Sequence, residues 1–70
     1  MFSGGICFPT FDEAKAAEAE LREAGFRTEI LDEIDEYSTA TFMNVSRAYG
    51  CFDQLEALVD PYNGFIIEAG

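Results

Sequence analysis

The side chains of this sequence best placed to act together are the carboxylates between residues 29 and 36. Five of them fall within eight residues, and no basic residue lies among them. They are Glu29, Asp32, Glu33, Asp35 and Glu36. Clustered carboxylates either hold a metal ion or form a surface that attracts a cationic partner.

The metal alternative fits the sequence poorly. The cluster lacks the D-x-[DN]-x-[DN]-G-x₅-E spacing of a calcium-binding loop. The chain has no histidine, and Cys7 and Cys51 lie far apart, so a zinc ligand set is not indicated either. We therefore expect no metal site and no cofactor.

A second acidic group precedes this cluster, in a segment with helical periodicity. Glu18 and Arg22 are four residues apart and are predicted to pair, which leaves Glu13, Glu20 and Glu23 as an unpaired outer stripe. Carboxylates one helical turn apart are separated by about 5–6 Å. Phosphates along one DNA strand have a comparable spacing, and a duplex presents one charge per roughly 1.7 Å of axis. Such an array is suited to a groove of Arg and Lys that binds a phosphate backbone.

The charge of the whole chain indicates the class of partner. The chain has fourteen Asp and Glu residues but only four Lys and Arg residues, which gives a net charge of −10. A surface of this sign repels nucleic acid and anionic membranes and attracts basic proteins. We expect a monomer that binds a basic nucleic-acid-binding protein, with no direct contact to nucleic acid or membrane. The alternative is an acidic face that only keeps the protein soluble.

Catalysis is not expected from these residues. Without histidine, a Ser or Cys nucleophile would depend on a carboxylate or on Lys15 as its base. No apolar run is long enough to span a membrane, and the N-terminus lacks the basic region of a signal peptide. A cytoplasmic setting follows, in which Cys7 and Cys51 are read as reduced thiols; a disulfide is the other reading.

Two helices are predicted. Thr10 and Glu13 form the pattern of a capping box for a helix that starts at residue 11 and stops at Gly25. A shorter helix runs from about residue 51 or 52 to Val59, and Asp60-Pro61 ends it.

Strand patterns surround these helices, over residues 1–9, 26–34, 39–49 and 65–69. The order β-α-β-β-α-β in one 70-residue domain predicts an α+β, ferredoxin-like fold. Its four-stranded antiparallel sheet would carry two helices on one face. Most of the aromatic side chains are expected in the core, namely Phe8, Phe11, Phe26, Phe42, Phe52 and Phe65. Tyr37, Tyr49 and Tyr62 are candidate exposed anchors in a protein interface.

In size, charge and element order, the whole chain resembles the small acidic inhibitors that phages and mobile elements use against nucleic-acid enzymes. The nearest type is the DNA-mimicking anti-CRISPR proteins of type I systems. This resemblance implies a CRISPR surveillance complex as partner and the host cytoplasm as location. The chain is also similar to the ribonuclease E regulator B family, through Ala24-Gly25-Phe26 and the late segment Tyr62-Asn63-Gly64-Phe65. That family has Asp where this chain has Asn63.

These observations lead to a non-enzymatic inhibitor as the expected function. The predicted binding residues are the five acids of residues 29–36, with Glu13, Glu20 and Glu23 as auxiliary charges and Tyr37 as an anchor. The alternative is a regulatory or antitoxin-like interaction module, in which an apolar and aromatic patch supplies the affinity and charge only steers the encounter.

Overall fold

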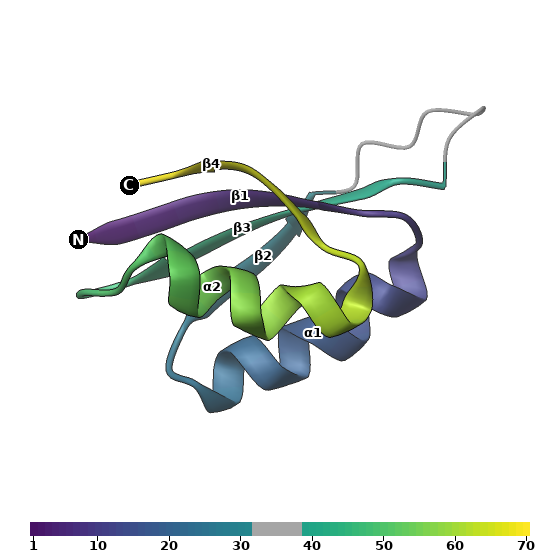
Figure 1. Ribbon diagram of the computed structural model, residues 1–70. Helices are drawn as coiled ribbons and strands as arrows, with labels where there is room; N and C mark the ends of the chain where they lie inside the picture. Colours follow the sequence, from purple (N-terminus) through teal and green to yellow (C-terminus); the bar gives the residue numbers. More distant parts are fainter. Residues whose placement is uncertain (32–38) are drawn as a thin grey trace.

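The chain forms the predicted order of strands and helices. The computed structural model describes residues 1–31 and 39–70. The elements are β1 (Phe2–Phe8), α1 (Phe11–Glu23), β2 (Arg27–Leu31), β3 (Thr41–Arg47), α2 (Phe52–Val59), a 3₁₀ turn η1 (Asp60–Tyr62) and β4 (Phe65–Ala69). The sheet order is β2-β3-β1-β4 with every neighbouring pair antiparallel, and both helices lie on the same side of it (Figure 1). The predicted ferredoxin-like α+β fold is confirmed.

Helix α1 has clear signals at both ends. The backbone of Thr10 is extended, and its hydroxyl accepts a hydrogen bond from the Glu13 amide at 3.2 Å. The same hydroxyl donates a hydrogen bond to the Glu13 carboxylate at 3.1 Å. In a full capping box this carboxylate would instead accept from the Thr10 backbone amide. At the other end, the amides of Gly25 and Phe26 donate to the carbonyls of Arg22 and Leu21. This is a Schellman motif, and Gly25 supplies its positive φ of 93°.

The core lies between the helices and the inner face of the sheet. Alternate residues of β1 and β3 point into it, because successive side chains of a strand face opposite sides. Its fully buried members are Ile6, Phe8, Ala14, Ala17, Leu21, Met43, Leu55 and Val59. Ala14 and Ala17 have small side chains, which allows α1 to pack against the sheet at these positions.

The predicted end of α2 at Val59 is confirmed, with Asp60 as the residue that caps the helix. The chain then continues through the 3₁₀ turn η1 to Tyr62, which the sequence did not predict. Asn63 then adopts a left-handed conformation with φ of 59°, which reverses the chain into β4. At Gly64 a β-carbon would lie only 2.7 Å from the Val59 Cβ and 2.8 Å from the Phe8 Cε1. A glycine is therefore required where this turn crosses the core.

Four of the phenylalanines expected in the core lie outside it, and one of them, Phe42, is half-buried at an outward position of β3. Phe8 and Phe26 are buried as predicted, but Phe11, Phe52 and Phe65 are 52%, 48% and 71% exposed. Phe11 and Phe52 occupy the first positions of their helices, outside the stripe that faces the sheet. Phe65 pairs with Cys7 on the side of the sheet that no helix covers (Figure 1). Apolar periodicity alone does not reveal which face of a sheet stays open.

Two further expectations concern the cysteines and the membrane. Cys7 is half-buried and Cys51 is exposed, and both are free thiols, as the sequence predicts. Within residues 1–31 and 39–70, no helix is long and apolar enough to cross a membrane.

Candidate partner-binding surfaces

The predicted binding residues fall into three regions of the chain. Asp32, Glu33, Asp35, Glu36 and Tyr37 lie outside the residues that the structure describes. The acids of α1 lie in the helical layer, whereas Glu29 lies on the opposite side of the sheet, at an exposed position of β2. The structure does not bring Glu29 together with the acids of α1.

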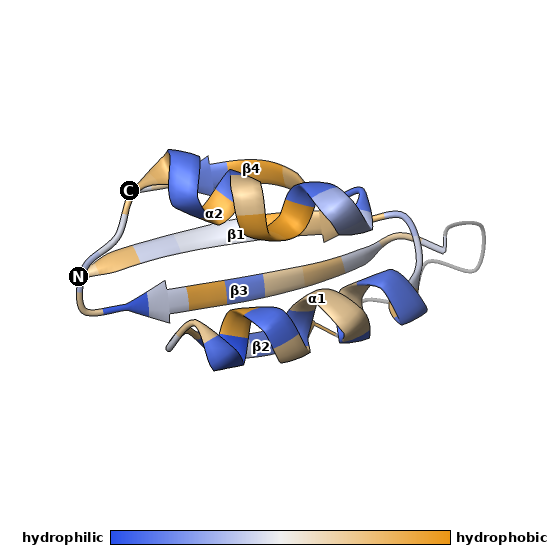
Figure 2. Ribbon diagram, turned by 60° about the horizontal axis from the view of Figure 1, so that its bottom comes forward, coloured by the Kyte–Doolittle hydropathy of each residue, from blue (hydrophilic) through white to orange (hydrophobic). Residues whose placement is uncertain are grey.

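The helical layer holds most of the described carboxylates. Seven of them, here called the acidic helical layer, belong to α1, α2 and η1 and are exposed, except for Glu13, which is half-buried. They are Asp12, Glu13, Glu20, Glu23, Asp53, Glu56 and Asp60. Figure 2 shows hydrophilic residues along both helices, which lie in front of the sheet in that view. The last three were not singled out from the sequence, because only the topology places α2 beside α1.

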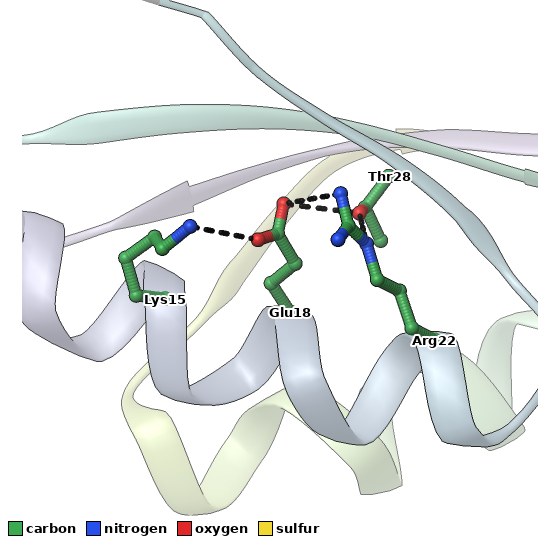
Figure 3. Close-up of polar contacts among 4 residues, drawn as sticks. All are labelled: Lys15, Glu18, Arg22 and Thr28. Carbon is green, nitrogen blue, oxygen red and sulfur yellow. Dashed lines mark hydrogen bonds and ion pairs between the residues drawn. The ribbon is translucent and has the colours of Figure 1, made fainter.

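Glu18 differs from these acids because it points toward the sheet (Figure 3). Its residue is only 6% exposed. Its carboxylate pairs with the Lys15 Nζ at 3.1 Å and with an Arg22 guanidinium nitrogen at 3.4 Å. The Thr28 hydroxyl donates to it at 3.0 Å and accepts from the Arg22 Nε at 2.8 Å. The predicted Glu18–Arg22 pair is confirmed, as part of a cluster that joins α1 to β2.

The protonation of Glu18 follows from this environment. Burial of the carboxylate raises its pKa, but the hydrogen bonds from Lys15 and Thr28 and the charge of Arg22 outweigh this effect. The pKa of Glu18 is therefore lowered. Lys15 and Arg22 are the cations of the helical layer, and both pair with this ionised carboxylate. In the described part of the chain, the ion pairs all involve Glu18, so the seven outer acids have no cationic partner.

Two outer acids fasten the η1 turn to α1. The Asn63 side-chain amide donates to the Glu13 carboxylate at 2.6 Å, and the Tyr62 hydroxyl lies 3.4 Å from the Glu20 carboxylate. Desolvation, together with the charge and hydrogen bond of Glu20, raises the pKa of Tyr62. Glu13 and Glu20 are thus free of ion pairs, as expected, but they are held in place. Two of the seven carboxylates of the acidic helical layer are therefore held in position by side chains that follow α2.

Arg47 does not neutralise the acids. Its guanidinium donates to the carbonyls of Tyr49 at 2.7 Å and Ala24 at 2.9 Å, and to the Gln54 side chain. It also lies 4.3 Å from the centre of the Phe26 ring. Arg47 therefore links the end of α1, the β3–α2 connection and a side chain of α2. Tyr49 beside it is 79% exposed and accessible to a partner.

The face of the sheet opposite the helices is open, and its outward residues align in three rows across the strands. The apolar row runs through Leu31, Phe42, Cys7 and Phe65. The carboxylate row runs through Glu29, Asn44, Gly5 and Glu68. The polar row runs through Arg27, Ser46, Ser3 and Gly70, the last joined to Ser3 by two backbone hydrogen bonds.

A register shift enlarges the apolar row. Between Gly5 and Ile6 the pairing with β4 slips, so Ile67 is an extra residue between Ile66 and Glu68. Ile67 is 54% exposed and lines a shallow hollow with Leu31, Phe42 and Gly5. A second, more polar hollow lies over Arg27, Glu29 and Ser46. Sequence reasoning missed this face; apolar residues at outward strand positions were the available signal.

The described residues offer no group of three or more His, Cys, Asp or Glu side chains arranged to hold a metal ion. No family model, curated protein or solved structure matches the chain.

Proposed function

We propose that this protein is a non-enzymatic inhibitor that occupies the basic nucleic-acid-binding groove of a partner protein. Its acidic surface takes the place of the nucleic acid. The observation that supports this function is the acidic helical layer, whose seven carboxylates have no cationic partner among the described residues. Residues 32–36 contribute four further carboxylates in the sequence.

The organisation of the layer favours binding to a cationic groove. Glu13 and Glu20 are held by hydrogen bonds to Asn63 and Tyr62, so part of the array is ordered before it meets a partner. Preorganised groups lose less conformational entropy on binding. Unpaired like charges also repel one another and lower the stability of the free protein. A surface of Arg and Lys relieves that repulsion.

The first partner to test is a type I CRISPR surveillance complex, on the basis of the resemblance to acidic anti-CRISPR proteins. Such a complex exposes basic surfaces to target DNA, and an inhibitor seated there would block DNA before it binds. The direct readout is the affinity of the complex for target DNA with increasing amounts of this protein.

Charge reversal in separate regions tests which surface is used. In the helical layer, Glu23→Lys with Glu56→Lys changes two exposed acids that make no hydrogen bond to other described side chains. Reversal of Asp32, Glu33, Asp35 and Glu36 to Lys tests the acidic segment that lies outside the described residues. The proposed surface leaves out Glu29, because the structure places it on the open face of the sheet, apart from the acids of α1. Glu29→Lys with Glu68→Lys is therefore the matched control, with the same change in net charge on that face.

We expect the helical-layer variant and the 32–36 variant each to lose inhibition by about tenfold or more, equivalent to about 1.4 kcal/mol. The control should lose much less. Equal inhibition by all folded variants would exclude a nucleic-acid mimic. A loss that is the same in the helical-layer variant and the control would show that only net charge matters.

A further inference from the structure

The open face of the sheet forms a second candidate binding surface, separate from the acidic helical layer. We propose that it docks a basic amphipathic helix of a partner protein. The apolar side of that helix would lie on the apolar row, and its Lys or Arg residues would contact Glu29 and Glu68. The alternative function considered from the sequence was an interaction module that binds through an apolar and aromatic patch. The proposal places that patch on the open face of the sheet.

The apolar row has the composition of such a docking site. Phe65 is 71% exposed and Ile67 is 54% exposed. Phe42 and Leu31 are half-buried beside them in the same row. Four large apolar side chains thus share one face, and aromatic side chains of this kind dominate the energetics of protein interfaces.

The neighbouring row determines the charge of the partner. Glu29 and Glu68 stand at opposite ends of it, on the two outer strands of the sheet, and neither forms an ion pair with a described residue. Between them lie Asn44 and Gly5, and Gly5 has no side chain to fill the floor of the hollow. An apolar row bordered by two free carboxylates is complementary to an apolar stripe bordered by basic residues.

The size of the face matches one helix. Three strand spacings of about 4.8 Å give a width of about 14 Å across the strands. A helix of about ten residues at about 1.5 Å per residue has that length. Two rows are separated by two strand residues, about 7 Å, so a helix about 10 Å across covers both of them.

Charge argues against a second copy of this chain as the occupant. Two copies would bring together two net charges of −10. A basic segment removes this repulsion, since its charge has the opposite sign.

The experiment measures binding of two synthetic peptides to the full chain by fluorescence anisotropy. One is a 14-residue amphipathic helix of Leu and Lys, and the other has the same composition in scrambled order. Both have the same charge, so the acidic helical layer attracts them equally. The wild-type protein should prefer the amphipathic peptide by about tenfold, the scale of one interface hot spot.

Matched variants then locate the site. Phe65→Ser with Ile67→Ser should abolish the preference for the amphipathic peptide, because both side chains are exposed and line the row. Glu29→Gln with Glu68→Gln should weaken its binding several-fold. Glu23→Gln with Glu56→Gln removes the same charge from the helical layer and should change this affinity by less than twofold. Thermal melts of each variant confirm that it is folded.

Amide chemical shifts of the wild-type protein provide a readout that needs no substitution. The amphipathic peptide should shift Cys7, Phe42 and Phe65, with little change in α1. Equal affinity for both peptides, or shifts confined to α1 and α2, would overturn the proposal. So would an equal loss of affinity in the two Glu→Gln pairs. None of these results depends on the inhibition of a nucleic-acid-binding protein, so the two functions can fail separately.

Discussion

Arg22 pairs with Glu18 at 3.4 Å across one turn of α1, so an exposed guanidinium at the edge of the helix is bound to a carboxylate that is buried against the sheet. Lys15 pairs with the other oxygen of the same carboxylate. A single buried acid therefore engages both cations of the helical layer. Neither cation is therefore paired with an outer acid of that layer.

Replacing Glu18 tests the strength of this cluster. Glu18→Gln keeps the shape of the side chain but removes the charge that Lys15, Arg22 and Thr28 stabilise. Hydrogen bonds to charged groups contribute about 1.5–3 kcal/mol, so we expect the free energy of unfolding to fall by about 1–2 kcal/mol. Urea denaturation measures it. Glu23→Gln, on the exposed side of the helix, is the control and should stay within about 0.5 kcal/mol of wild type.

Low pH should remove the contribution of the ionised Glu18 carboxylate to the free energy of unfolding. The pKa of Glu18 is lowered by folding from 4.5, so its stabilisation is complete above that pH and declines as the pH falls through the folded-state pKa. The stability difference between wild type and Glu18→Gln should therefore be large at about pH 7 and shrink toward about pH 3. Denaturation midpoints across this range measure it, and a difference that grows toward acid pH would contradict the assignment.

Gly64 is predicted to be intolerant of a side chain. In Gly64→Ala the new methyl group would approach Val59 and Phe8 to less than 3 Å, and both belong to the packed core. Overpacking of this kind costs about 1–3 kcal/mol, which thermal denaturation would detect. Gly5→Ala is the matched control, because its β-carbon would meet no atom closer than 3.7 Å. Equal stability of the two variants would show that the turn into β4 is not tightly packed.

Arg47 is predicted to require its guanidinium group. Arg47→Lys keeps the charge but cannot donate to Ala24, Tyr49 and Gln54 together, nor stack as a plane on Phe26. We expect a loss of about 1–2 kcal/mol in the free energy of unfolding. Arg27→Lys, on the exposed end of β2, should change it little. If both variants unfold at the same denaturant concentration, the contacts of the Arg47 guanidinium make no net contribution to the free energy of unfolding.

Local signals explain why the fold could be predicted. Thr10 and Glu13 mark the start of α1, Gly25 supplies the left-handed residue that ends it, and Asn63-Gly64 makes the final turn. Each signal acts within a few residues, so the sequence contains it directly. The strand order then follows from the handedness of the crossovers.

The surfaces were harder to predict, because they depend on register between distant strands. Leu31, Phe42, Cys7 and Phe65 come from four strands and meet only after pairing. The register shift between Gly5 and Ile6 in the β1–β4 pairing adds Ile67 to that row, and no local sequence pattern predicts this shift. Likewise, Asp53, Glu56 and Asp60 join the acidic helical layer because both helices cover the same face.

The most direct test of the central claim is a competition at two salt concentrations. A type I surveillance complex is titrated with this protein, in the presence and absence of duplex DNA, at roughly 50 mM and 200 mM salt. We predict that protein and DNA exclude each other, and that the affinity of the protein falls by at least about tenfold at the higher concentration. Simultaneous binding of both, or an affinity for the complex that salt leaves unchanged, would contradict nucleic-acid mimicry.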